Sequence, residues 1–269
     1  MASKDIKAIT EQLEQGVKNI FTSDKYIEYL NFMSKFTSYS FNNIVLILMQ
    51  KPDASLVAGY KAWQKKFNRQ VRKGEHGITS LAPCPHKKEV ETEDGETKEI
   101  IWNSFRAVTV FDISQTDGEA IPTGCVEKLT GEVENFTELK AKLEAVAPVP
   151  VAYENIKGTA NGYYSHKEQR IVVQEGMSEQ QTIKTLVHEI SHSILHSDEG
   201  EEKDADRSTR EVQAESVAYT VCPMLGLDTS DYSFGYVAGW STGKDIKELN
   251  ASMEVIRKTA QDIAEKIAA

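Results

Sequence analysis

Two histidines and a glutamate form an H-E-x-x-H pattern at His188, Glu189 and His192. Residues four apart on an α-helix project from the same face, so both histidines could bind one zinc ion. Glu189 would then lie beside the metal, where a carboxylate can take a proton from a water molecule that the metal activates. The pattern therefore predicts a catalytic zinc site with Glu189 as general base, provided that the stretch is helical.

The residues around this pattern predict the required helix. Ser178 is a favourable N-cap, and Gln181 three residues later can complete a capping box. No proline or glycine interrupts the chain from there to Ser197. Apolar residues recur at helical spacing and supply a stripe that faces the core: Ile183, Leu186, Val187, Ile190, Ile194 and Leu195.

A catalytic zinc site needs a third protein ligand. His196 continues the four-residue series, but a rise of about 1.5 Å per residue puts it roughly 12 Å along the axis from His188. It therefore cannot bind the same ion as His188 and His192. Glu211 and Glu215 lie four apart on a second predicted helix. We assign Glu211 as the ligand and Glu215 as the carboxylate that orients a ligating histidine, although spacing alone also permits the reverse order.

The two motifs together resemble the gluzincin type of zinc metallopeptidase. In that family H-E-x-x-H is followed about twenty residues later by E-x-x-A and an acidic residue, as in E-V-Q-A-E from Glu211 here. The resemblance implies that Glu211, the first glutamate of the second motif, binds the metal. A phenol near the site would support the oxyanion of the reaction. The candidates, each of which could equally be a core residue, are Tyr163, Tyr164 and Tyr219.

Charge is spread unevenly along the chain. The formal net charge is −10, yet residues 1–125 hold 16 basic and 16 acidic residues, so the acidic excess lies in residues 126–269. Residues 51–88 contain nine Lys or Arg and two acidic residues. A local basic patch within an acidic protein is typical of a nucleic-acid partner, and the uneven charge suggests that the two halves have different roles.

Aromatic and basic residues are interleaved from Val57 to Ile78, a stretch called here the aromatic–basic segment. Bases can stack on exposed rings while cations follow the phosphates, as in platforms that bind single strands. Spacing alone favours another interpretation, in which Trp63 and Phe67 at i and i+4 anchor a short helix in a core. The candidate DNA contacts are Tyr60, Trp63, Lys65, Lys66, Arg69, Arg72 and Lys73.

Four motifs follow one another through the first half. They are Y-S-F-N-N (39–43), P-D-A-S-L-V-A-G-Y-K-A-W (52–63), R-Q-V-R-K-G-E-H-G-I (69–78) and F-R-A-V-T-V-F-D-I-S-Q-T-D-G (105–118). Together they resemble the N-terminal single-stranded-DNA-binding domain of ArdC-type antirestriction proteins, over most of residues 5–125. The resemblance favours DNA binding by the aromatic–basic segment as a whole and adds Tyr39, Asn42 and Asn43 to the candidate contacts.

Motifs of the second half also resemble ArdC-type proteins, in their metallopeptidase-like domain. These are G-Y-Y (162–164), E-V-Q-A-E-S-V-A-Y (211–219) and Y-V-A-G-W (236–240). Those relatives commonly carry a glycine shortly after the second histidine, where this chain has S-I-L-H (193–196). In that helix the chain is more similar to LtrC-like relatives and to the ImmA/IrrE group of zinc metallopeptidases. The resemblance implies a role on mobile elements, protecting incoming single-stranded DNA from host restriction.

The predicted fold is α+β, with two domains at residues 1–125 and 126–269. In the first domain we expect a small antiparallel sheet and helices over 4–21, 23–36 and 37–50, although periodicity leaves the last of these open as a buried strand. The expected strands are 78–83 and 100–111, and Asp94-Gly95 is a hairpin turn between them.

The second domain is expected to be zincin-like, helical with a small sheet. A strand near 149–153 and a hairpin over 160–174 would lie beside the metal helix, where an edge strand aligns a peptide substrate. The acidic stretch 198–206 lacks the alternating spacing of a calcium loop and is interpreted as a solvated loop.

Composition indicates a cytoplasmic protein with no membrane partner. The start, M-A-S-K-D-I-K-A-I-T, has no apolar region of a signal peptide. The longest apolar run, 44–49, is too short to span a bilayer. Three widely separated cysteines form no disulfide or metal framework, and an odd count suits a reducing compartment: Cys84, Cys125 and Cys222.

The sequence thus predicts an antirestriction-type protein that binds single-stranded DNA and carries a zinc-dependent metalloendopeptidase with an unknown protein substrate. The alternative is a non-catalytic DNA-binding shield with a structural zinc site. Glu189 argues against that alternative, because a purely structural site needs no general base. A metal-dependent nuclease is disfavoured, since such sites usually gather carboxylates around Mg²⁺.

Overall fold

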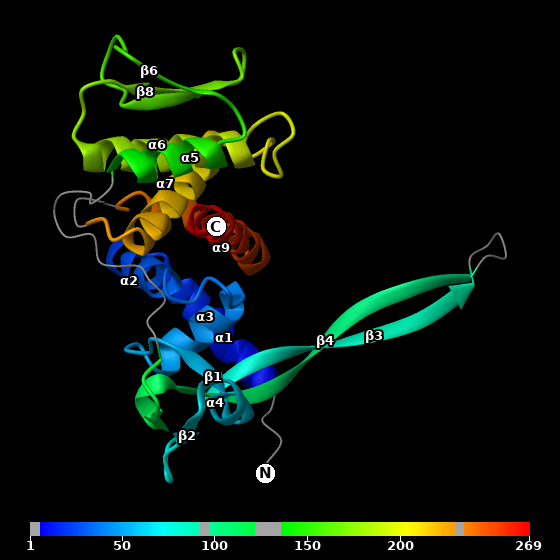
Figure 1. Cartoon of the computed structure of the whole chain (residues 1–269). Helices are drawn as coiled ribbons and strands as arrows, with labels where there is room; N and C mark the ends of the chain where they lie inside the picture. The colour runs from blue at the N-terminus through cyan, green and yellow to red at the C-terminus, as the bar shows by residue number, and fades with distance from the viewer. Residues whose placement is uncertain (1–5, 92–96, 122–135, 230–233) are drawn as a thin grey trace. The chain divides into compact units, whose positions relative to one another are not determined.

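The computed structural model describes residues 6–91, 97–121, 136–229 and 234–269 (Figure 1). The predicted Asp94-Gly95 turn lies outside these residues. The chain divides into two compact units, one made of Met1–Gly16 and Asn42–Ile121, the other of Val17–Phe41 and Pro122–Ala269. The described elements have the α+β class that the sequence predicts.

The division differs from the predicted domains in the placement of residues 17–41, which belong to the second unit. Buried contacts explain the difference. The hydroxyl of Tyr26 lies 2.8 Å from Ser216 Oγ, and the Tyr26 ring packs edge-on against Phe234 with centroids 5.1 Å apart. These contacts join residues about 200 positions apart in the chain, so helical periodicity gives no sign of them.

The first unit contains helices and two small antiparallel sheets. One sheet has the order β1-β4-β3 and the other pairs β2 with β5. The helix α1, Ile6–Ile20, begins in this unit and ends in the second. The other elements of the first unit are α3 Phe41–Gln50, β1 Val57–Gly59, α4 Tyr60–Phe67, β2 Arg69–Val71, β3 Ile78–Glu91, β4 Thr97–Asp112, η1 Ile113–Gln115 and β5 Thr116–Gly118.

The strands β3 and β4 form a long two-stranded ribbon (Figure 1). The predicted strand 78–83 is therefore too short, because the strand continues through charged residues that carry no apolar alternation. The outer edge of β3 is protected in two ways. Asn43 accepts from the backbone N–H of Leu81 at 2.8 Å and donates to its carbonyl at 2.9 Å. Further along, Pro83 and Pro85 have no backbone N–H that could be left unpaired. Proline is tolerated in β3 because this strand lies at the edge of the sheet.

The apolar run that periodicity left open is a helix, α3. Its residues Ile44, Val45 and Ile47 are buried. The helix ends at Gln50, just before Lys51-Pro52, because proline disfavours helical geometry in the residue that precedes it.

The second unit stacks a three-stranded sheet on layers of helices (Figure 1). In the sheet, of order β6-β8-β7, β6 runs parallel and β7 antiparallel to the central strand β8. The predicted strand and hairpin are confirmed, since β7 and β8 pair across the turn near residue 167. The elements are α2 Ser23–Met33, α5 Phe136–Val146, β6 Val151–Glu154, β7 Gly162–Ser165, β8 Arg170–Gln174, α6 Glu179–Leu195, α7 Arg207–Met224, α8 Val237–Ser241 and α9 Ile246–Ala268.

No helix in the described parts of the chain is both long and apolar enough to cross a membrane.

Candidate metal centre

The helix α6 carries the H-E-x-x-H pattern and starts as the sequence predicts. The Ser178 side chain accepts from the backbone N–H of Gln181, which makes it the N-cap. Gln181 does not complete the predicted capping box. Its amide donates instead to Thr185 Oγ1 at 3.2 Å, one turn further into the helix. Most of the predicted apolar stripe is buried in the core, with Ile183, Leu186, Val187, Ile190 and Leu195 all at or below 3% exposure. Ile194 is the exception, since its side chain is only partly buried.

Packing of α6 against α7 brings three candidate ligand atoms together. The Nε2 atoms of His188 and His192 lie 3.1 Å apart, and Glu211 Oε2 lies 3.8 Å from the first and 3.9 Å from the second. Four ligand atoms placed tetrahedrally at about 2 Å from one ion are separated by about 3.3 Å. The three side chains therefore lie close to the spacing that a single metal ion requires, and each offers one ligand atom to such an ion.

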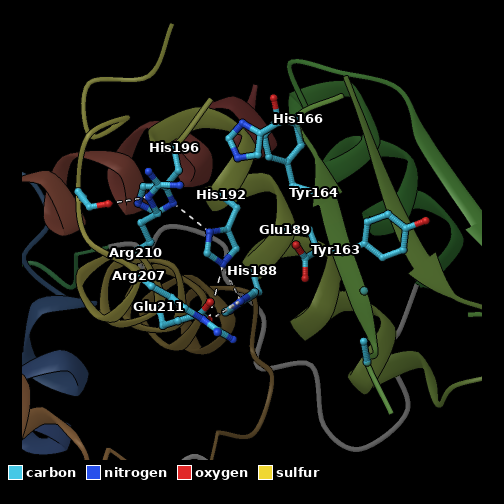
Figure 2. A pocket seen from close by; sticks show the side chains of 13 residues that line it. Tyr163, Tyr164, His166, His188, Glu189, His192, His196, Arg207, Arg210 and Glu211 are labelled. Carbon is cyan, nitrogen blue, oxygen red and sulfur yellow. Dashed lines mark hydrogen bonds and ion pairs between the residues drawn. The ribbon is translucent and has the colours of Figure 1, made fainter. Parts of the chain in front are cut away.

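The second glutamate of α7 contacts the far side of a histidine ring. Glu215 Oε2 lies 3.0 Å from His188 Nδ1, which donates to it. A proton on Nδ1 leaves the Nε2 lone pair of His188 pointing toward Glu211 (Figure 2). Burial lowers the pKa of His188, but the hydrogen bond to Glu215 and the charges of nearby glutamates outweigh burial and raise that pKa above its usual value. Glu211 thus lies nearer the Nε2 atoms of both histidines, while Glu215 contacts the opposite nitrogen of His188.

Glu189 lies beside this cluster with its carboxylate buried at the edge of β7 (Figure 2). It accepts a hydrogen bond from the backbone N–H of Tyr164. Gly162 permits the close approach of strand and helix, because a Cβ there would lie 2.7 Å from Thr185 Cγ2 and 3.1 Å from Glu189 Cγ. Burial raises the pKa of Glu189 to about 7, although the charge on His188 opposes the change. A carboxyl with that pKa can both take and release a proton near neutral pH.

His192 on α6 and His196 at its C-cap have lowered pKa values. Burial, followed by the charges of His188 and His196, lowers the pKa of His192 to about 2. Burial also lowers the pKa of His196 to about 4. A neutral imidazole is the form that binds a metal. His196 does not face the proposed ligand cluster, as its distance along the helix predicts, and its ring instead contacts the opposite nitrogen of His192.

A cleft of about 740 Å³ opens over the site. Several of its lining residues were not singled out from the sequence as site residues, because they are adjacent only after folding. They include His166 on the hairpin turn and Arg207 and Arg210 at the start of α7. Arg210 is engaged structurally, since it donates to the carbonyls of Ala205 and Lys203.

None of the three predicted phenols is directed at the ligand cluster. Tyr163 projects from the face of β7 opposite the histidines (Figure 2), as alternation along a strand requires. Tyr164 donates to Gln169 at 3.3 Å, and Tyr219 is buried against Phe234.

Another tyrosine, Tyr236, which the sequence did not indicate, is influenced by the charges of the two glutamates of α7. Burial and then the charges of Glu215 and Glu211 raise the pKa of Tyr236. Its only signal in the sequence is its place in Y-V-A-G-W, which neither spacing nor residue type connects to the metal motifs.

The candidate DNA contacts fall into exposed and structural groups. The exposed group contains Tyr60, 44% exposed, and the side chains of Lys65, Lys66 and Lys73. Trp63 contradicts the prediction of stacking, because it is 0% exposed and donates to the carbonyl of Phe111 at 2.9 Å. Its ring packs against Phe67, as the alternative interpretation of the spacing proposed.

The two arginines of the aromatic–basic segment hold β5 and its flanks. Arg69 donates to the side chain and carbonyl of Thr116, at 2.8 Å each, and to the carbonyl of Gly118 at 3.1 Å. Arg72 pairs with Glu75 at 2.7 Å and with Asp117 at 3.3 Å.

The polar DNA-contact candidates at and before the N-terminal end of α3 are also buried or bonded within the protein. Asn43 is occupied by the β3 edge, and the Asn42 Oδ1 atom is buried. Tyr39 is half-buried, and this burial raises its pKa. It belongs to the second unit and not to the unit of the other candidates.

Each half of the chain matches a known family. Residues 2–111 match the model of the N-terminal domain of anti-restriction factor ArdC, and residues 146–259 match the IrrE N-terminal-like domain. The chain has the two-domain architecture of ArdC-type proteins. The second match gives the unit around α6 and α7 a metallopeptidase-like fold.

Solved structures support the same fold. The metal-free antirestriction ArdC protein from plasmid R388 has a TM-score of 0.54 at 22% identity, covering 86% of this chain and 84% of that one. The Mn(II)-bound form of that protein has a TM-score of 0.55 at 20% identity, covering 89% and 98%.

One curated relative extends beyond this architecture. An uncharacterised protein of Bacillus anthracis is 29% identical over 98% of this chain. The chain spans about half the length of that relative, 51%.

Proposed function

We propose that the second unit is a zinc-dependent peptidase and that the first unit binds single-stranded DNA in an antirestriction role. The observation that carries the peptidase is the convergence of His188 Nε2, His192 Nε2 and Glu211 Oε2 beside the buried carboxylate of Glu189. A structural zinc site is usually closed by four protein ligands, whereas three ligands leave one position open.

The residues of the site have separable roles. His188, His192 and Glu211 would hold the metal, which when bound supplies Lewis-acid activation of water and of a peptide carbonyl. Glu189 would take a proton at its carboxylate and return it to the leaving amine, a role supported by the position of its buried carboxylate beside the ligand cluster. The strand β7 forms one end of the sheet order and lines the cleft, so an extended peptide could pair along it.

Zinc is proposed over manganese because two imidazoles and one carboxylate are a frequent catalytic zinc set. The R388 protein has a Mn(II)-bound structure, which makes manganese the natural competitor. Metal analysis of the purified chain should find about one zinc ion per chain. Tighter binding of Mn²⁺ than Zn²⁺ would reject the choice of zinc and leave the ligand set intact.

DNA binding is proposed for the exposed part of the aromatic–basic segment. Tyr60 offers a ring to a base, while Lys65, Lys66 and Lys73 carry charge that backbone phosphates would neutralise. The ArdC-type architecture supports this assignment, and a broad sequence tolerance is expected because every base has a face that can stack.

A non-catalytic shield is the second candidate, and one contact favours it. The hydrogen bond from Tyr164 N–H to Glu189 gives that glutamate a structural role in fastening β7 to α6. In this case the metal would stabilise the second unit, and protection would rest on DNA binding alone.

The variant Glu189→Gln separates the two candidates. Glutamine keeps an oxygen that can accept from Tyr164 N–H but cannot take a proton, so metal content and folding should persist. Glu179→Gln, at an exposed position of the same helix, is the matched control. Host lysate incubated with and without single-stranded DNA is searched for new protein N-termini. We expect their yield to fall about 10²–10⁴-fold in Glu189→Gln and to be unchanged in the control. Equal cleavage by the wild type and Glu189→Gln would reject the peptidase mechanism.

A further inference from the structure

His196 cannot bind the same ion as His188, yet it is 1% exposed and its ring lies against His192. The Nδ1 atoms of the two rings are 2.9 Å apart. The other nitrogen of His196, Nε2, lies 2.9 Å from Gln213 Oε1 on α7 (Figure 2 draws the histidine contact). His192 therefore contacts a second imidazole where His188 contacts the carboxylate of Glu215.

The direction of these hydrogen bonds follows from the next residue. Gln213 Nε2 lies 3.0 Å from Glu202 Oε2 and 3.2 Å from Ser252 Oγ. An ionised carboxylate can only accept, so the NH₂ group of the Gln213 amide must face Glu202. The amide oxygen then faces His196 and can only accept a hydrogen bond from it.

The orientation of the Gln213 amide in turn determines which nitrogens of His196 and His192 donate and which accept. His196 must carry its proton on Nε2 to satisfy Gln213, so its Nδ1 is an acceptor. His192 must then carry its proton on Nδ1, which leaves the Nε2 lone pair directed toward the ligand cluster. We infer that Glu202, Gln213 and His196 form a hydrogen-bond relay that fixes the tautomer and ring orientation of His192 for metal binding.

The relay begins on the acidic stretch 198–206, which is not only the solvated loop that its composition predicts. The backbone N–H of Glu202 donates to the carbonyl of Leu195 at 2.9 Å, at the end of α6. Gly200 lies so close that a Cβ would be 2.2 Å from the same carbonyl oxygen. The loop thus passes tightly over the end of the helix, which turns the Glu202 carboxylate toward Gln213.

The three relay residues act through His192 and are positioning residues. Gln213 is 0% exposed, so its amide is shielded from bulk solvent and a lost partner is costly. Removing the partner that orients a ligating histidine typically weakens metal binding by about 10–100-fold. The consequence for the metal rests on the proposed metal site, whereas the tautomer of His192 is a property of the metal-free chain.

Two readouts on the full-length protein test the relay. The first is ¹⁵N NMR of the imidazoles in the metal-free chain at neutral pH, which should show a proton on Nδ1 of His192 and on Nε2 of His196. The second is Zn²⁺ affinity, measured by competition with a chelator. In Gln213→Met, His192 should populate both tautomers and Zn²⁺ should bind about 10–100-fold more weakly.

The variants Glu202→Gln and Glu201→Gln provide a second test if Gln213→Met does not fold. Both remove one acidic charge from adjacent loop residues, but Glu201 is exposed and its carboxylate lies 4.0 Å from Lys258. Glu202→Gln should weaken Zn²⁺ binding, and Glu201→Gln should not. The relay is rejected if wild-type His192 carries its proton on Nε2, or if both loop variants bind Zn²⁺ like the wild type. Absence of peptidase activity in the wild type, with the expected tautomers present, would instead count against the proposed function alone.

Discussion

Residue spacing predicts both the candidate metal centre on α6 and α7 and a DNA-binding surface in the aromatic–basic segment. The structure brings the predicted residues of the first together but buries or engages several of the second. In the metal centre the predicted ligand atoms meet within 4.8 Å. In the aromatic–basic segment Trp63 is buried and both arginines are engaged within the fold. The difference lies in what helical spacing determines. It fixes how side chains of one helix lie relative to one another, but not which face of that helix the rest of the unit covers.

Burial of α4 illustrates this limit. Trp63 and Phe67 pack with ring centroids 5.0 Å apart, and the carbonyl of Phe111 on β4 accepts the indole N–H. The exposed face of the same helix carries Tyr60, Lys65 and Lys66. A stacking platform and a core anchor have the same pattern of residues, and only the position of the sheet distinguishes them.

The largest expected effect tests which face of α4 matters for stability. Trp63→Ala removes a fully buried ring and should lower the free energy of unfolding by about 3–5 kcal/mol. Tyr60→Ala on the exposed face should change it by less than about 1 kcal/mol. Urea denaturation, followed by hydrogen exchange in peptides of β4, measures both. A small effect of Trp63→Ala would show that the indole is not a core residue and restore it as a DNA contact.

The second effect tests the two glutamates of α7. Glu211→Gln removes a proposed ligand and should weaken Zn²⁺ binding by more than about 100-fold, whereas Glu215→Gln removes an orienting partner and should cost about 10–100-fold. Chelator competition measures both affinities. If Glu215→Gln is the more damaging change, the two roles are reversed.

Much of the geometry of the candidate metal centre could be predicted, because the spacings that define it lie within single helices. His188, Glu189 and His192 belong to one helix, and Glu211 and Glu215 to another, so each set has a known relative geometry. The α+β class and the β7–β8 hairpin were accessible for the same reason.

What could not be predicted depends on contacts between distant residues. The contact between Tyr26 and Ser216 holds α2 in the second unit, and the hydrogen bond between Gln213 and Glu202 connects a loop to α7 beside the candidate metal centre. Neither pair is marked by residue type or by periodicity. The extended β3–β4 ribbon was underestimated because its charged residues resemble those of a loop.

A smaller effect is expected from the exposed lysines. Replacing Lys65, Lys66 and Lys73 with alanine should weaken single-strand binding and reduce the slope of log affinity against log salt by about 2, since about 0.7 counterion is released per phosphate contact. The control replaces three exposed lysines of α9, Lys247, Lys258 and Lys266, with the same change in net charge. Fluorescence anisotropy with labelled oligonucleotides gives both slopes. Equal slopes in the two variants would mean that general charge, and not this surface, governs binding.

The smallest effect concerns Asp112, in the F-D-I-S-Q-T-D-G motif that resembles ArdC-type proteins. Burial raises the pKa of its carboxyl, but hydrogen bonds from Ser114, Ser55 and Leu56 outweigh burial and hold that pKa below its usual value. A depressed pKa in the folded chain stabilises the fold at neutral pH, and this stabilisation is lost as the pH falls through the unfolded value toward the folded one. The wild type should therefore lose stability as the pH falls below about 4.

Asp112→Asn should cost about 1 kcal/mol at pH 7 and less at pH 3, because asparagine still caps the η1 turn but accepts fewer hydrogen bonds and carries no charge. The matched control is Asp117→Asn, in the same motif. Asp117 is exposed and pairs with Arg72 on the surface, so this change should alter stability by less than about 0.5 kcal/mol at either pH. Urea denaturation at the two pH values gives the comparison. If Asp112→Asn leaves stability unchanged at pH 7 but weakens single-strand binding, the motif serves DNA contact directly, and the division between structural and exposed residues in the first unit must be redrawn.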